Sequence, residues 1–125
     1  MLVSDLRPDE PVYLDLDRLE DICNQLGYSG GETAICAAME DVAAMLHKAT
    51  VMWQADELGA LERVAQQIAS VADRIGMAGL ARVAGDVLSL CDGFDAPALA
   101  ATVARMRRLG ERSLLAIWDQ QDQTI

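Results

Sequence analysis

Apolar residues between Glu32 and Trp53 recur in alternating steps of four and three residues, and this spacing limits the possible folds more than any other feature of the chain. Residues spaced in this way lie on one side of an α-helix. The segment is therefore predicted to be an amphipathic helix that buries one face against other helices. The stripe consists of Ile35, Met39, Val42, Leu46, Ala49 and Trp53.

The rest of the chain repeats this helical pattern. We expect a short helix at about residues 15–25 and long helices at about 57–75, 77–91 and 95–119. Apolar residues make up 52% of the chain but aromatic residues only 4%, and no segment shows the alternation typical of strands. Because short connections between long helices favour antiparallel neighbours, the predicted fold is an all-α, antiparallel up-and-down four-helix bundle with a short extra N-terminal helix. Residues 1–14 are expected to form an extended lead-in, and residues 15–125 the bundle.

Two kinds of residue mark the expected ends of these helices. Gly27, Gly30 and Gly31 predict a turn before the helix at 32–53, because glycine favours turns. Asp56 and Asp95 are predicted N-caps of the helices that follow them, since a short carboxylate can accept hydrogen bonds from free backbone N–H groups.

The charge of the chain is strongly negative and unevenly distributed. The formal net charge is −10, and residues 1–62 contain 13 acidic and 3 basic residues. Such a surface would be repelled by the phosphates of nucleic acid and of an anionic membrane. We therefore expect neither as a partner, whereas a protein partner with a basic face is compatible with this charge.

The cysteines and the N-terminus give further expectations. Cys23, Cys36 and Cys91 are odd in number and lack the close spacing of a zinc site, so they are expected to be reduced thiols packed among apolar residues. No metal or cofactor is expected. The first residues lack the basic and apolar regions of a signal peptide, and no apolar run approaches the ~18 residues of a spanning helix. These features predict a cytoplasmic protein.

The segment from Ala65 to Gly76, with the sequence AQQIASVADRIG, resembles the motif of histidine-containing phosphotransfer (HPt) domains. In that family a histidine on a bundle helix accepts phosphate and is followed at +3 by lysine, at +4 by a small residue and later by an Ile/Val-Gly pair. The residues in the same register here are Ala65, Ile68, Ser70, Ala72, Ile75 and Gly76. The likeness extends over about residues 14–118, since the order of helices is also similar.

Three positions depart from this family pattern, and one of them is Asp73, a carboxylate where the family tends to have a small neutral residue. Gln66 occupies the place of the phosphoacceptor histidine, and Ala69 occupies the place of the lysine. A neutral imidazole has a free lone pair that can attack phosphorus, whereas the nitrogen lone pair of an amide is delocalised into its carbonyl. Glu62 and Asp73 nearby would also repel a phosphoryl group. The sequence therefore predicts a protein that is no enzyme and does not accept phosphate at this position.

The resemblance implies a docking face and a class of partner. The expected face consists of Glu62, Gln66, Ala69, Ser70 and Asp73, which lie off the buried stripe and are expected to be exposed. In HPt domains the corresponding face meets a response-regulator receiver domain or a histidine kinase. The resemblance thus implies a phosphorelay protein of two-component signal transduction that binds such a partner without accepting phosphate.

Two alternatives remain open at this level. His47 is the only histidine and is an alternative phosphoacceptor, although Lys48 beside it points about 100° away around the helix. The chain could instead be a dimerising or assembly module in which apolar residues outside the core, such as Met45 and Trp118, pair between copies. A monomer or a weak homodimer is expected.

Overall fold

The computed structural model describes residues 10–93 and 95–122, and within these ranges every regular element is a helix. This confirms the all-α prediction. Two long helices, α2 and α5, have 27 residues each, whereas α3 has 17 and α4 has 14. The five helices are α1 (Leu16–Leu26), α2 (Tyr28–Gln54), α3 (Leu58–Arg74), α4 (Ala78–Cys91) and α5 (Ala96–Asp122).

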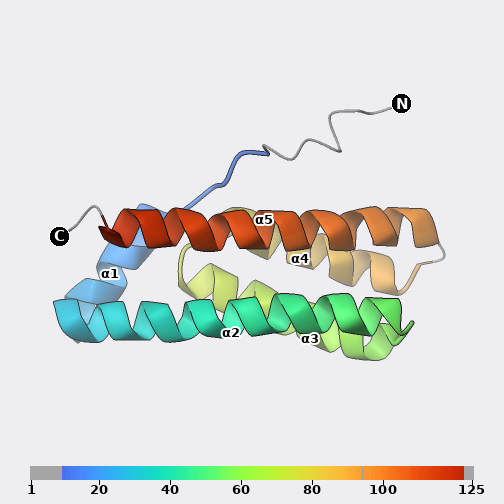
Figure 1. The fold of residues 1–125 in the computed structure, drawn as a ribbon, viewed down its shortest axis with the longest axis horizontal. Coiled ribbons are helices and arrows are strands. Elements are labelled where there is room, and N and C mark those ends of the chain that lie inside the picture. Colours follow the sequence, from blue (N-terminus) through green and yellow to red (C-terminus); the bar gives the residue numbers. More distant parts are fainter. Residues whose placement is uncertain (1–9, 94, 123–125) are drawn as a thin grey trace.

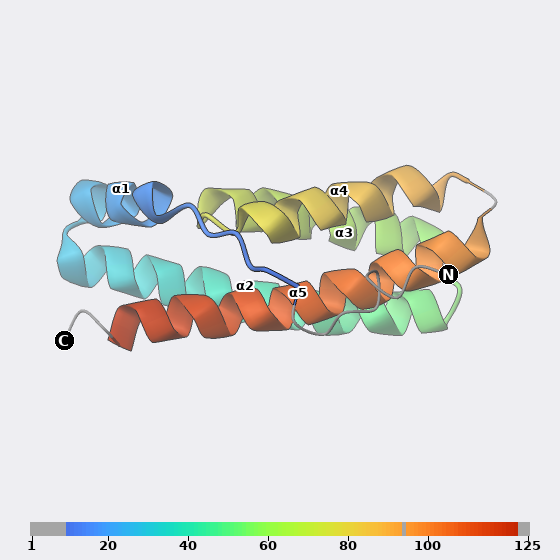
Figure 2. The same ribbon diagram turned by 90° about the horizontal axis from the view of Figure 1, so that it is seen from above.

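Helices α2 to α5 lie side by side, and successive helices run in opposite directions (Figure 1). Each packs against the next, and α5 packs back against α2, so the four enclose a common core. Helix α1 packs on α2 at the end of the molecule that the shorter α3 and α4 do not reach (Figure 2). The described part is therefore two-layered, with α2 and α5 in one layer and α1, α3 and α4 in the other.

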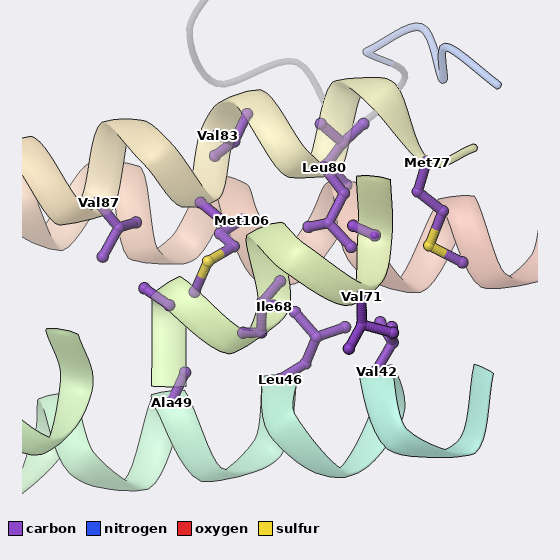
Figure 3. Close-up of a cluster of buried hydrophobic side chains, with 14 of the residues drawn as sticks. Val42, Leu46, Ala49, Ile68, Val71, Met77, Leu80, Val83, Val87 and Met106 are labelled. Carbon is purple, nitrogen blue, oxygen red and sulfur yellow. The ribbon is translucent and has the colours of Figure 1, made fainter. Parts of the chain in front are cut away.

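The predicted apolar stripes form this core. In α2 the stripe residues Ile35 to Ala49 are buried, and Trp53 at its end is half-buried. In α3, Leu61 and Ile68 are fully buried, and Ile68 lies among side chains of α2, α4 and α5 (Figure 3). The largest fully buried side chains are Leu61, Ile68, Met77, Leu80, Met106 and Ile117. The core is aliphatic and sulfur-containing.

The predicted turn at Gly27, Gly30 and Gly31 is wrong for two of the three glycines. Gly27 makes the turn, with a φ of 79°, but Gly30 and Gly31 lie inside α2, which begins at Tyr28. Gly31 faces α1, where a Cβ atom would lie 2.6 Å from the Cα atom of Cys23. This glycine is therefore needed for the close approach of two helices and not for a turn.

The predicted N-cap at Asp56 is also wrong, whereas the one at Asp95 is confirmed. Asp56 has a φ of 58° and lies just after α2, where the N–H of Glu57 donates to the carbonyl of Met52 over 2.9 Å. This six-residue hydrogen bond is the helix-ending Schellman pattern, in which the residue after the C-cap is left-handed. Asp56 thus ends α2. At α5 the Asp95 carboxylate accepts a hydrogen bond from the N–H of Ala98 over 3.0 Å.

The segment of residues 10–15 before α1 contacts the α3–α4 turn and α5. Residues 10–15 form no helix, and the predicted lead-in residues 1–9 lie outside the described part. The Asp15 N–H donates to the Gly76 carbonyl over 2.7 Å, and Glu10 pairs with Arg105 of α5 at 2.6 Å. A Cβ atom on Gly76 would lie 2.5 Å from the Asp15 oxygen. Gly76 also has a φ of 78°, which suits the residue that ends α3. Its missing side chain leaves room for the Asp15 carbonyl.

Candidate functional site

The predicted docking face lies on α3, opposite the side that enters the core. Leu61, Ala65 and Ile68 are buried, and Gln66 points away from this stripe and is exposed. One and two turns further along the same face, Ser70 and Asp73 are also exposed, while Glu62 and Ala69 are half-buried. We call these five residues, Glu62, Gln66, Ala69, Ser70 and Asp73, the α3 face. The five residues lie on one side of α3, but Glu62 and Ala69 are less exposed than expected, and Ala69 also packs against the core.

The electrostatics of the α3 face are negative. Glu62 lies near the C-terminal end of α4, where burial raises the pKa of the Cys91 thiol and the carboxylates of Glu62 and Asp92 raise that pKa further. Neither Glu62 nor Asp73 forms an ion pair with another residue of the described ranges. A phosphoryl group placed on this face would therefore meet carboxylates that no basic side chain of the described residues pairs with.

The α3 face presents an amide, a serine hydroxyl and two carboxylates. Its central side chain is the Gln66 amide, which donates and accepts hydrogen bonds but is not a nucleophile. Within residues 10–93 and 95–122, no group of three or more His, Cys, Asp or Glu side chains is arranged to hold a metal ion. The face can form hydrogen bonds and shape-specific contacts with another protein.

His47 is separated from this face. It is exposed on α2 and lines a hollow together with Val51, Arg107 and Leu114, on the side where α2 meets α5. No residue of the α3 face lines that hollow. The structure does not bring His47 and Gln66 into one site.

The cysteines and Met45 are part of the packing. Cys91 is buried in the core, and Cys23 is half-buried against it. Cys36 is half-buried where its thiol lies 4.0 Å from the Oε1 atom of Gln121. Met45, which the sequence analysis named as a possible interface residue, is half-buried and packs against the core.

None of the described helices has both the length and the apolar character needed to cross a membrane.

A second surface, which was not predicted from the sequence, lies between α2 and α5. Three hollows adjoin one another along these helices. The central hollow shares Cys36, Glu40 and Trp118 with the first. It shares Ala43, Glu111 and Leu114 with the third. The central hollow has a volume of about 520 Å³. We call this continuous surface the α2–α5 groove. It is lined by Ser29, Glu32, Thr33, Cys36, Ala37, Met39, Glu40, Ala43, Leu46, His47, Thr50, Val51, Gln54, Arg107, Glu111, Leu114, Leu115, Trp118 and Gln121.

Exposed apolar side chains are concentrated away from the α3 face. Leu115 is 64% exposed and Trp118 is 56% exposed, and both line the α2–α5 groove. No large exposed hydrophobic side chain of the described residues lies on α3 or α4. The only signal for the groove in the sequence is that Leu115 and Trp118 fall off the buried stripe of α5.

Comparisons of this chain with models of protein families, with curated proteins and with solved structures gave no match.

Proposed function

We propose that this protein is a phosphorelay adaptor of HPt-like up-and-down architecture, which binds a response-regulator receiver domain or a histidine kinase through the α3 face and accepts no phosphate. One observation carries the proposal. Gln66 is exposed in the middle of a bundle helix, at the position where an HPt domain would present its histidine. The small side chains of Ala69 and Ser70 beside it leave room for a docked partner.

The absence of a nucleophile at position 66 separates this proposal from phosphotransfer. An adaptor of this kind would occupy a receiver or kinase without removing its phosphate, and so would compete with an active HPt domain. This follows from the amide at Gln66, since catalysis by covalent phosphotransfer requires a nucleophilic nitrogen at the docked position.

The proposal is tested with phosphorylated receiver domains from the same host. Calorimetric titration is expected to detect binding of at least one receiver or kinase, and incubation with its phosphorylated form is expected to leave no acid-labile phosphate on this chain. Ser70→Arg, which places a large charged side chain on the α3 face, should abolish binding. Ser89→Arg is the matched control, because Ser89 is an exposed serine on α4.

Two results would contradict the proposal. One is transfer of label to the wild-type chain that disappears in His47→Ala, which would identify an active phosphotransfer protein using His47. The other is binding that Ser70→Arg and Ser89→Arg leave equally intact, since the α3 face would then have no part in docking.

A further inference from the structure

The α2–α5 groove combines exposed apolar side chains with a length that suits a helix. On α2 its lining runs from Ser29 to Gln54, which corresponds to about 38 Å at 1.5 Å per residue. Apolar groups occur along this whole length, from Trp118 and Leu115 through Leu114 to Val51. An amphipathic helix laid in such a groove would contact it with residues spaced three and four apart.

The charges around the groove define the partner further. Glu32 and Glu40 lie on its edge at the end that holds Trp118, and both are exposed and form no ion pair within the described residues. Glu111 is already paired with Arg107, at 3.2 Å. The unpaired carboxylates favour a partner helix that carries Lys or Arg beside its apolar stripe.

A second copy of this chain fits the groove less well than such a helix. Each copy has a net charge of −10, so two copies repel each other over the Debye length at physiological salt. A basic helix gains attraction from the same charge.

We propose that the α2–α5 groove binds an amphipathic helix of another protein, one with a leucine-rich stripe flanked by Lys or Arg. The groove and the α3 face lie on different layers of the bundle, and this inference does not depend on the phosphorelay proposal. Trp118 and Leu115 supply the apolar anchors, as large side chains in a groove commonly do. Glu32 and Glu40 favour a basic partner.

The experiment uses two synthetic helical peptides with the same leucine stripe, one flanked by lysines and the other by glutamates, titrated calorimetrically into the full chain. The lysine peptide is expected to bind about tenfold or more tightly than the glutamate peptide, and its affinity is expected to fall with added salt. Glu32→Gln with Glu40→Gln should reduce this difference. Leu115→Ser with Trp118→Ser should weaken the lysine peptide by about tenfold or more.

The control is Leu26→Ser, which removes a leucine of similar exposure (56%) on α1 and should leave peptide affinity unchanged. Circular dichroism checks that each variant folds. The inference is overturned if neither peptide binds, if both bind equally, or if the Leu115 and Trp118 variants bind as the wild type does. Light scattering that detects a dimer lost in the Leu115 and Trp118 variants would overturn it too, because a second copy would then be the occupant.

Discussion

Ile68 and Gln66 lie two residues apart on α3 and have opposite environments. Ile68 has no exposed surface, whereas Gln66 is exposed. Ile68→Ala should lower the free energy of unfolding by about 2–4 kcal/mol, because it removes buried methyl groups and leaves a cavity. Gln66→Ala should change it by less than about 0.5 kcal/mol. Urea denaturation measures both, and similar losses in the two variants would contradict the orientation of α3.

The fold perturbs the titration of the Cys91 thiol. Burial, Glu62 and Asp92 raise its pKa above the ordinary value of 9.0, so the folded state holds the thiol proton more tightly than the unfolded state. The resulting stability is fully present below pH 9.0 and is lost as the pH rises through the higher folded pKa. The difference in free energy of unfolding between wild type and Cys91→Ala should therefore shrink as the pH is raised from about 8 to about 10. A difference that stays constant would contradict this environment for the thiol.

At the scale of the elements, the α3–α4 turn depends on one glycine. Gly76 is left-handed and lies against the Asp15 carbonyl, so Gly76→Ala should destabilise the protein by about 1–3 kcal/mol. Gly85 lies inside α4, and a Cβ atom there would meet nothing within 4 Å. Gly85→Ala should instead stabilise the protein by about 0.5–1 kcal/mol. Thermal denaturation compares the two, and changes of the same sign would contradict the assigned roles.

The start of α5 depends on the Asp95 cap. Asp95→Ala removes the acceptor for the Ala98 N–H and should cost about 0.5–2 kcal/mol. Asp86→Ala is the control, because Asp86 is an exposed carboxylate within α4 and its loss should be nearly neutral. Chemical denaturation of the two variants provides the comparison. An Asp95 variant as stable as the Asp86 variant would contradict the cap.

Across the whole molecule, the helices could be predicted because each repeats an apolar stripe, whereas several of their ends could not. Gly31 lies inside α2 because of its contact with α1, and Asp56 is left-handed because it ends α2. Both features depend on how neighbouring segments pack against each other. The pattern of residues within one segment does not contain this information. The exposure of Gln66 followed from its distance from the stripe. For the α2–α5 groove the sequence showed only that Leu115 and Trp118 lie off the buried stripe, because the groove forms only where these two helices, far apart in sequence, lie side by side.

We propose that the α3 face has a docking geometry for a phosphorylated partner and lacks only the phosphoacceptor chemistry. The most direct measurement is phosphate transfer from a phosphorylated receiver domain to the double variant Gln66→His with Ala69→Lys, with the wild type alongside. We expect acid-labile phosphate on residue 66 of the double variant and none on the wild type. A double variant that folds, as judged by circular dichroism, yet stays unlabelled with every receiver that binds the wild type would contradict it.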